Sequence, residues 1–151
     1  MNPEFRHRTG LEVRFRDIDA FRHVNNAAFF TYIEQARVRY LIDILELDAV
    51  ERAPLILAAA QIDFRAPILF GQDVEIGTRV DWIGRTSFSM SHRLEAGADH
   101  RLVAEAGTVL VAYDYAAERP IPVPDPWRAA MTTYEGHDLA RQPETAPSLV
   151  R

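Results

Sequence analysis

The sequence of 151 residues contains no cysteine and no lysine, and these two absences exclude several kinds of chemistry. Without cysteine there are no disulfides, no thiolate metal ligands and no thiol nucleophile. All 17 residues in the Lys and Arg count are arginine, which excludes a Schiff-base lysine and a P-loop lysine. No apolar run approaches the roughly 20 residues that a membrane-spanning helix needs. The N-terminus lacks the apolar segment of a secretory signal, so a cytoplasmic location without a membrane partner is expected.

The composition is that of a globular protein, with 48% hydrophobic and 26% charged residues and a formal net charge of -5. Such a length suits one domain with a single core. A mildly acidic chain is not expected to bind nucleic acid in general. We assign residues 1–134 to this domain. Residues 135–151 mix Gly, Pro, Glu, Thr and Ser with few large apolar residues, and we expect them to form a flexible C-terminal tail.

Hydrophobic periodicity predicts one strand, one long helix and then four strands. Apolar residues 11, 13 and 15 alternate with charged ones, which indicates a strand over residues 12–16. An apolar residue recurs every three or four positions from Asn26 to Leu47, which predicts a long helix with Asn25 or Asn26 as its N-cap. Alternation with period two then predicts strands over residues 61–65, 73–82 and 87–94. The run over residues 102–113 is apolar on both faces for much of its length, which indicates a central strand. Asp125 and Pro126 have the types expected at the start of a short last helix.

This order of elements defines the fold class. Strands that follow one another closely, with short Gly- and Pro-containing turns, favour antiparallel pairing. One long apolar helix and one curved antiparallel sheet can bury each other, which makes a two-layer α+β domain. The sheet would keep open edges, so we expect the chain to form a homodimer or a homotetramer.

Candidate chemistry is concentrated in the polar segment at residues 16–26, which ends at the start of the long helix. The common motifs of serine hydrolases, zinc proteases and nucleotide-binding folds are missing, and the histidines have no metal-ligand spacing. A helix N-terminus presents unpaired N–H groups that stabilise a developing oxyanion, and a carboxylate beside it can attack an acyl carbon or activate water. A simpler interpretation stays open, in which Asp17 and Asp19 only cap a turn.

A resemblance to a known family bears on this choice. The stretch VRFRDIDAFRHVNNAAFFTYIEQAR resembles the signature of the 4-hydroxybenzoyl-CoA thioesterase family of hotdog-fold acyl-CoA thioesterases. DFRAPILFGQDVEI and ERPIPVP look like later segments of the same family, so the similarity runs from about residue 12 to residue 126. The resemblance implies a hotdog fold, in which a curved antiparallel sheet wraps around one long central helix. It also implies hydrolysis of an acyl-CoA thioester to the free acid and CoA.

The resemblance assigns roles residue by residue. Asp19 matches the family's catalytic carboxylate, as nucleophile or general base, and Asn26 matches the position whose backbone N–H polarises the thioester carbonyl. His23, Val24 and Asn25 match the loop that shapes the pocket. Arg22 stands where the family often has glycine, and it is a candidate for contact with an acidic or phosphate group of the substrate. Asp17 is expected to be a structural partner in the turn.

The nucleotide of CoA would need contacts of its own. The segment Arg85, Thr86 and Ser87 follows Gly84 at a strand start, and related thioesterases meet the nucleotide with a basic and hydroxyl-bearing segment at this place. Arg65 and Arg93 are weaker candidates, because outward charge is the default on alternating strands. We expect Glu34 and Arg37 to pair across one helical turn. We expect His92 to be a hydrogen-bonded core residue.

No metal and no separate cofactor are expected, because CoA enters as part of the acyl-CoA substrate. Two other functions remain as alternatives: a non-catalytic acyl-CoA binding module and a hotdog enoyl-CoA hydratase. Hydratases of this kind use an Asp/His pair in a different motif, which is not found in the sequence. An acyl carrier protein in place of CoA as the acyl donor also stays open.

Overall fold

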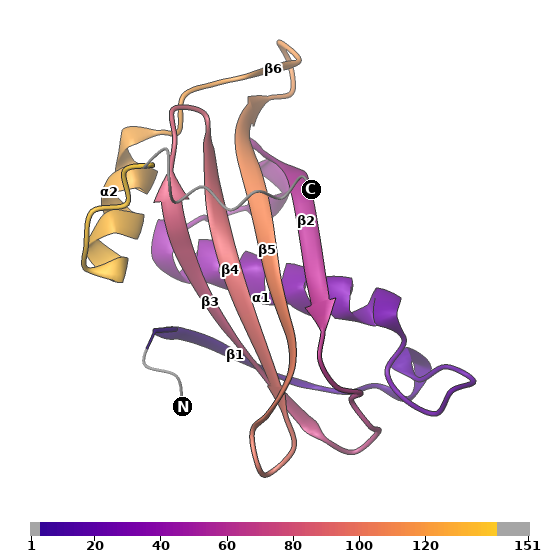
Figure 1. Cartoon of the computed structure of the whole chain (residues 1–151). Coiled ribbons are helices and arrows are strands. Elements are labelled where there is room, and N and C mark those ends of the chain that lie inside the picture. The colour runs from indigo at the N-terminus through magenta and orange to yellow at the C-terminus, as the bar shows by residue number, and fades with distance from the viewer. Residues whose placement is uncertain (1–3, 142–151) are drawn as a thin grey trace.

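The computed structural model describes residues 4–141, which form two α-helices, six strands and two short 3-10 turns (Figure 1). In chain order these are β1 (His7–Glu12), η1 (Phe15–Asp17), α1 (Asn26–Leu45), η2 (Val50–Arg52), β2 (Leu55–Phe64), β3 (Asp73–Ile83), β4 (Ser87–Ala96), β5 (Arg101–Asp114), β6 (Arg119–Pro120) and α2 (Asp125–Glu135).

The strands form one antiparallel sheet in the order β1-β3-β4-β5-β2, with the two-residue β6 paired to the end of β5. The long helix α1 lies across one face of this sheet, and α2 lies beside β3 (Figure 1). This is the hotdog arrangement of one central helix wrapped by a curved sheet, so the predicted α+β fold is confirmed. None of the described helices is long and apolar enough to span a membrane.

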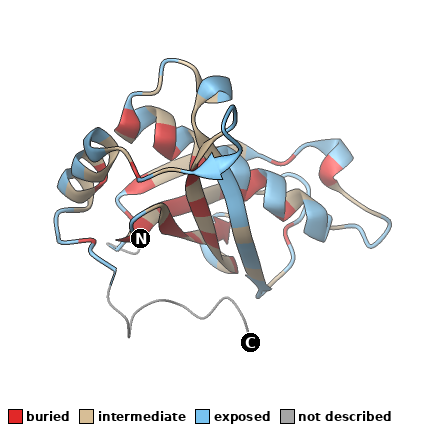
Figure 2. Cartoon of the chain, turned by 90° about the horizontal axis from the view of Figure 1, so that it is seen from above, coloured by how far each residue is buried: buried red, intermediate tan, exposed pale blue. Residues whose placement is uncertain are grey.

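The core is made where α1 meets the sheet, and Figure 2 shows the buried residues gathered there. One cluster surrounds the first half of α1 and includes Phe29 and Ile33, which contact residues from β3, β4 and β5. A second cluster surrounds Tyr40 and Leu41 in the other half and includes residues of α2. Since α1 is fixed along its length by both clusters, its N-terminus has a defined place relative to the sheet.

The ends of α1 follow from local chemistry. Asn25 is the N-cap, and its side-chain oxygen accepts a hydrogen bond of 2.8 Å from the Ala27 N–H. The helix ends at Leu45, two residues before the expected end, because Glu46 adopts a left-handed conformation with φ of 52°. A left-handed residue terminates the helical hydrogen-bond pattern.

The first strand is the main difference from the predicted elements. The sheet contains His7–Glu12, whereas the alternation had indicated residues 12–16. The chain leaves the sheet after residue 12 and turns through η1, where the Arg14 N–H donates to the Asp17 carboxylate at 3.0 Å. Phe15, expected on a buried strand face, is 81% exposed. A local side-chain cap therefore overrides the alternating pattern.

The C-terminal part of the domain extends beyond the boundary expected at residue 134. Glu135 is the last residue of α2, and Leu139 is buried in the second core cluster. The Ile83 N–H donates to the Leu139 carbonyl at 2.7 Å, which attaches this segment to β3. The rest of the expected tail, residues 142–151, lies outside the described residues.

Candidate active site

The predicted catalytic segment forms a tight loop before α1. An isolated antiparallel bridge joins Ile18 to Val24, and the Asp19 N–H donates to the His23 carbonyl at 3.2 Å. The half-buried Asp19 has one carboxylate oxygen, Oδ1, that accepts from the Phe21 N–H at 2.8 Å. No partner of the other oxygen lies among residues 4–141. The loop therefore orients the Asp19 carboxyl group through one oxygen and leaves the second available for chemistry.

Arg22 closes this loop in an unusual backbone conformation. Its φ is 69°, in the left-handed region, and its N–H donates to the Asp19 carbonyl at 3.0 Å. Glycine adopts such angles without cost, whereas a residue with a side chain is strained there. Arg22 thus keeps the conformation that a glycine at this position would favour, and its side chain is exposed.

The start of α1 provides an unpaired backbone donor. Asn25 is engaged as the N-cap, and its own N–H donates to the Asp17 carbonyl at 2.8 Å. The N–H of Asn26, the first helical residue, has no acceptor among the described residues. This N–H also lies at the positive end of the helix dipole. It is therefore free to donate to a ligand oxygen.

A cavity of about 300 Å³ adjoins this helix start. It is lined by His23 and Val24 of the loop, by Asn26 and Phe29 of α1, and by the end of β2 with the residues that follow it. The structure thus brings two of the predicted site residues, His23 and Asn26, to one cavity. Asp19 belongs to the same loop but is not among the lining residues.

Arg65 also lines this cavity, although its sequence context gave it a low rank. It is exposed and forms an ion pair of 3.1 Å with Glu105 on the neighbouring strand. Alternation along β2 indicated an outward charge, which is correct, but the alternation does not show that the end of β2 meets the helix start. Arg93 instead pairs with Glu95 at 2.8 Å and does not line the cavity.

Asp17 has the structural role that was expected for it. Its buried carboxylate accepts hydrogen bonds from Tyr32 Oη at 2.7 Å and from the Arg14 guanidinium at 3.1 Å. Burial alone would raise the pKa of Asp17, but these hydrogen bonds outweigh it, and the pKa lies below its usual value. Asp17 therefore stays ionised and joins η1 to α1, which fixes the loop that carries Asp19.

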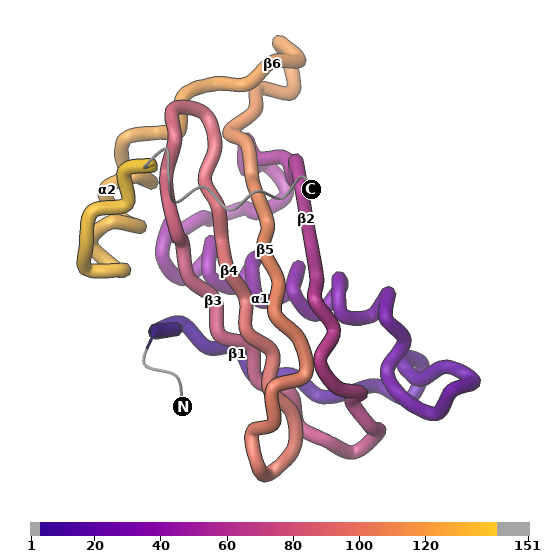
Figure 3. Tube along the Cα trace, viewed as in Figure 1, coloured from indigo at the N-terminus to yellow at the C-terminus, as the bar shows by residue number. Residues whose placement is uncertain are grey.

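The predicted nucleotide-binding residues Arg85, Thr86 and Ser87 lie far from this cavity within one chain. Arg85 and Thr86 lie in the turn between β3 and β4, and Ser87 begins β4, at the opposite end of the molecule from the loop before α1 (Figure 3). Ser87 pairs with one end of β5, whereas Phe64 of the cavity pairs with Ala104 near the other end. On β4, the residue opposite Ala104 is Leu94, seven positions after Ser87. Seven positions along a strand correspond to about 23 Å. A single chain thus does not join the two parts of the predicted site.

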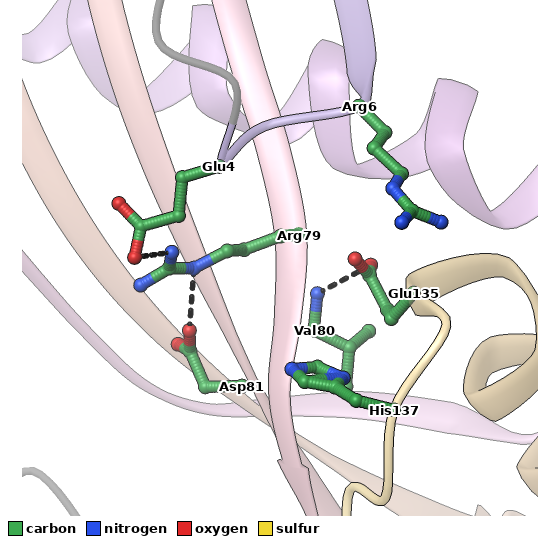
Figure 4. Close-up of a pocket in the computed structure, with 7 residues that line it drawn as sticks. All are labelled: Glu4, Arg6, Arg79, Val80, Asp81, Glu135 and His137. Atoms are coloured by element: carbon green, nitrogen blue, oxygen red, sulfur yellow. Dashed lines mark hydrogen bonds and ion pairs between the residues drawn. The ribbon is translucent and has the colours of Figure 1, made fainter.

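A second, polar cavity of about 370 Å³ lies between β3 and the end of α2 (Figure 4). Arg79 forms ion pairs with Glu4 and with Asp81, and Glu135 accepts from the Val80 N–H at 2.9 Å. Figure 4 shows these groups turned toward one another. Because its charges are paired within the chain, this cavity offers no group prepared for acyl chemistry.

Among the described residues, one cluster places three possible metal ligands together: atoms of Glu75, Glu95 and His100 lie within 4.8 Å of one another. Sequence spacing did not reveal this cluster, because the pairing of β3 with β4 creates it. Arg8 donates to Glu75 at 2.7 Å, and Arg93 donates to Glu95 at 2.8 Å. With a guanidinium on each carboxylate, the arrangement is a sheet ion-pair network.

Comparison with known proteins identifies the family. Residues 13–131 match the model of the thioesterase-like superfamily. A curated but uncharacterised protein of Bacillus subtilis, YsmA, is 23% identical over 82 residues. That match spans 54% of this chain and about half, 56%, of the curated relative.

Solved structures show the same fold. A thioesterase from Thermus thermophilus, crystallised with coenzyme A and Zn, is 36% identical, with a TM-score of 0.82 over 91% of this chain and 99% of that one. A thioesterase-superfamily protein from Jannaschia is 28% identical, with a TM-score of 0.79 over 89% and 85%. A 1,4-dihydroxy-2-naphthoyl-CoA thioesterase from Synechocystis, at 22% identity, shares the fold, with a TM-score of 0.75 over 83% and 94%.

The class that fold and family define is that of hotdog thioester hydrolases. The matched region contains the whole loop around Asp19, all of α1 and every strand from β2 to β6. The chain belongs to the thioesterase-like superfamily.

Proposed function

We propose that this protein hydrolyses an acyl-CoA thioester to the free acid and CoA. The observation that carries the proposal is the unpaired Asn26 N–H at a cavity beside the loop of Asp19. The coenzyme A held by the Thermus thioesterase supports CoA as the carrier of the acyl group.

In the proposed mechanism the thioester carbonyl oxygen accepts the Asn26 N–H at the positive end of α1. As the tetrahedral intermediate forms, its oxyanion gains more from this donor than the ground-state carbonyl does. Asp19 either removes a proton from the attacking water or attacks the carbonyl itself, which forms an anhydride that water then opens. In both cases the C–S bond breaks, the thiolate takes up a proton, and no metal or separate cofactor takes part.

His23, Asn25 and Arg22 support this reaction in different ways. His23 lines the cavity, Asn25 holds the helix start, and the Arg22 side chain offers a charge for an acidic part of the substrate. Arg85, Thr86 and Ser87 are proposed to contact the nucleotide of CoA. Given their distance from the cavity within one chain, they serve a site whose acyl cavity belongs to another subunit.

We further propose that the chain forms a homodimer through β2, or a homotetramer that contains such dimers. β2 is the last strand of the sheet, with one edge unpaired among the described residues. Ile56, Leu57 and Phe64 on this strand and Phe30 on α1 are 39–48% exposed. An exposed apolar edge strand is a template for pairing with a second copy.

Replacement of Asp19 tests the catalytic proposal. We expect Asp19→Asn to lower kcat for acyl-CoA hydrolysis by about a hundredfold or more, with a small change in KM, because the group that activates water or attacks is lost. Release of free thiol from short, long and aromatic acyl-CoAs is the measurement. Asp48→Asn, an exposed position beyond the far end of α1, is the matched control.

The same assay separates the alternatives. Unchanged turnover by Asp19→Asn would remove Asp19 from the mechanism. Loss of enoyl absorbance without thiol release would indicate a hydratase, and tight retention of acyl-CoA without products would indicate a binding module. Hydroxylamine added during turnover converts an aspartyl–acyl anhydride in part to a hydroxamate of the Asp19 side chain, which mass spectrometry detects on the protein and which forms only if Asp19 is the nucleophile.

A further inference from the structure

A second, more enclosed cavity of about 70 Å³ lies between α1, β2 and β5. This cavity is close to the cavity at the helix start. Phe30 of α1 and Ile62 of β2 line it, while Phe29 and Phe64, from the same two elements, line the cavity at the helix start. Its walls are mostly apolar, and its polar groups are Glu34, Arg37 and Thr108.

Arg37 is the unusual group in this cavity. It is 7% exposed, yet its only partner among the described residues is the Glu34 carboxylate at 3.7 Å, which is too long for a hydrogen bond. Glu34 is itself 66% exposed and so compensates the charge weakly. A buried guanidinium with five donors and no acceptor is costly to the fold unless a ligand supplies the acceptor.

The groups behind Arg37 carry no negative charge. Thr108 Oγ1 lies 3.1 Å from His92 Nε2, and His92 Nδ1 lies 3.2 Å from Thr78 Oγ1 on the next strand. All three side chains are buried and hydrogen-bonded to one another. Burial, with the nearby Arg37 charge, lowers the pKa of His92 to about 3, so its ring is neutral at ordinary pH. The positive charge of Arg37 is therefore not balanced within the interior.

The position of the cavity suits the far end of an acyl group. Arg37 follows Asn26 by eleven helical residues, or about 16 Å along the axis. Its side chain leans back toward the helix N-terminus, which brings the guanidinium nearer to the Asn26 N–H. The volume of about 70 Å³ exceeds the roughly 10–15 Å³ that a cavity needs to hold one water molecule, so one small terminal group fits.

We propose that this cavity binds a carboxylate at the far end of the acyl group, so that the preferred substrates are CoA thioesters of medium-length dicarboxylic acids. A carboxylate accepts two parallel N–H bonds from a guanidinium and neutralises it, which an alkyl or hydroxyl end does not. Arg37 is in this view a specificity-determining residue. The proposal rests on the proposed thioesterase activity and extends it to a substrate class.

Matched pairs of substrates test the proposal. We expect the wild-type enzyme to have a higher kcat/KM for suberyl-CoA than for octanoyl-CoA, and for adipyl-CoA than for hexanoyl-CoA. Arg37→Met should lower each ratio by roughly tenfold to a hundredfold, while the alkanoyl substrates keep or increase their kcat/KM. Arg37→Lys, which keeps the charge without the planar fork, should restore part of the ratio. Arg39→Met, which removes an exposed arginine of α1 that lines neither cavity, is the matched control and should leave the ratio unchanged.

Three results would overturn the proposal: a wild-type preference for the alkanoyl substrates, an equal effect of Arg37→Met on both members of a pair, or a change only in subunit association. The last would assign the Arg37 charge to contact with a second copy. If Arg37→Met does not fold, the ratio of kcat/KM within each substrate pair, measured for the wild-type enzyme and for Arg37→Lys, still tests the proposal.

Stabilisation of the wild-type protein by free suberate, weakened in Arg37→Lys and lost in Arg37→Met, tests the site without turnover. Suberate stabilisation without hydrolysis of any acyl-CoA would therefore refute the thioesterase proposal and keep the carboxylate site. Hydrolysis of alkanoyl-CoAs without stabilisation by suberate would refute the carboxylate site and keep the thioesterase proposal.

Discussion

At the scale of single residues, Arg22 has a strained backbone conformation in the loop that carries Asp19, the proposed catalytic residue. Its φ of 69° costs about 1–2 kcal/mol for a residue with a side chain. We expect Arg22→Gly to raise the free energy of unfolding by roughly 0.5–1 kcal/mol, because the gain is offset in part by the greater freedom of glycine in the unfolded chain. Denaturant unfolding of both proteins measures this difference.

Arg22→Ala separates the backbone of this residue from its charge. This variant loses the guanidinium but keeps the strained angle, so it should be less stable than Arg22→Gly. If Arg22 contacts an acidic part of the substrate, KM for acyl-CoA should rise equally in both variants. Equal stability of the two variants would show that the left-handed conformation carries no measurable strain.

The roles of individual residues were predictable only where their partners are near in sequence. Asp17 was correctly expected to be structural, because a short Asp turn is a local feature. Its bond to Tyr32, fifteen residues away, depends on how α1 returns over η1. Arg37 shows more clearly that local sequence does not predict contacts between distant elements. Its spacing from Glu34 predicted an ion pair, but its burial follows from β2 and β5, which the spacing cannot include.

At the scale of elements, a polar layer crosses the centre of the sheet. His92 on β4 lies between Thr78 on β3 and Thr108 on β5, with ring nitrogens at 3.2 and 3.1 Å from the two hydroxyls. The hydrogen bonds satisfy a group that would otherwise be costly to bury, as expected for His92 from its apolar neighbours. They hold three adjacent strands in register beneath α1.

This layer makes stability depend on pH. The pKa of His92 is about 3 in the folded protein, against about 6.5 for histidine in an unfolded chain. Between these values the unfolded chain binds a proton that the folded protein does not. The free energy of unfolding should therefore fall as pH decreases below about 6.5, by up to about 1.4 kcal/mol per pH unit. Denaturant unfolding at a series of pH values measures this slope.

Two variants isolate the contribution of His92. His92→Gln keeps hydrogen-bonding groups but does not titrate, so it should be less stable than wild type at neutral pH and show a flatter slope. His137→Gln changes an exposed histidine and should keep the wild-type slope. The lowered pKa values of Asp17 and Asp43 make the free energy of unfolding fall in the same direction, but only at the acid end of this window, so the slopes are compared above about pH 5. A wild-type slope in His92→Gln would assign the effect to another group.

Elements with a long and regular pattern were predicted well. The spans expected for β3, β4 and β5 differ from the observed ones by at most two residues at either end, because alternation marks the first two and a long run that is apolar on both faces marks the third. β1 was misplaced, because the cap formed by Asp17 ends the strand while its alternation continues. β2 is longer than expected, since the run of small and apolar residues before Gln61 has no alternating pattern.

At the scale of the whole molecule, a single chain does not bring the two parts of the proposed site together. The cavity at the helix start and the turn of Arg85, Thr86 and Ser87 lie at opposite ends, while the apolar edge strand β2 forms a wall of both cavities along α1. A second copy paired to β2 would cover the exposed apolar residues of this edge and enclose the acyl cavities further. Catalysis is then expected to depend on association.

A substitution on the open edge of β2 tests this dependence. Ala58 is exposed and lies at the irregularity between Leu57 and Ala59, where it has no partner on β5. We expect Ala58→Pro to interrupt pairing with a second copy while the intrachain sheet remains, because proline removes a donor and is tolerated at bulges and edges. Light scattering should then show a dimer or tetramer of the 17.2 kDa chain for wild type and a monomer for the variant.

Turnover gives the second readout of this experiment. If both cavities and the nucleotide contacts need a partner, kcat/KM for acyl-CoA should fall together with association, and dilution of the wild-type protein should reproduce that fall. Circular dichroism of Ala58→Pro controls for loss of the fold. A monomeric and folded variant with full activity would show that one chain binds CoA and acyl group unaided, and Arg85, Thr86 and Ser87 would then have no place in the site.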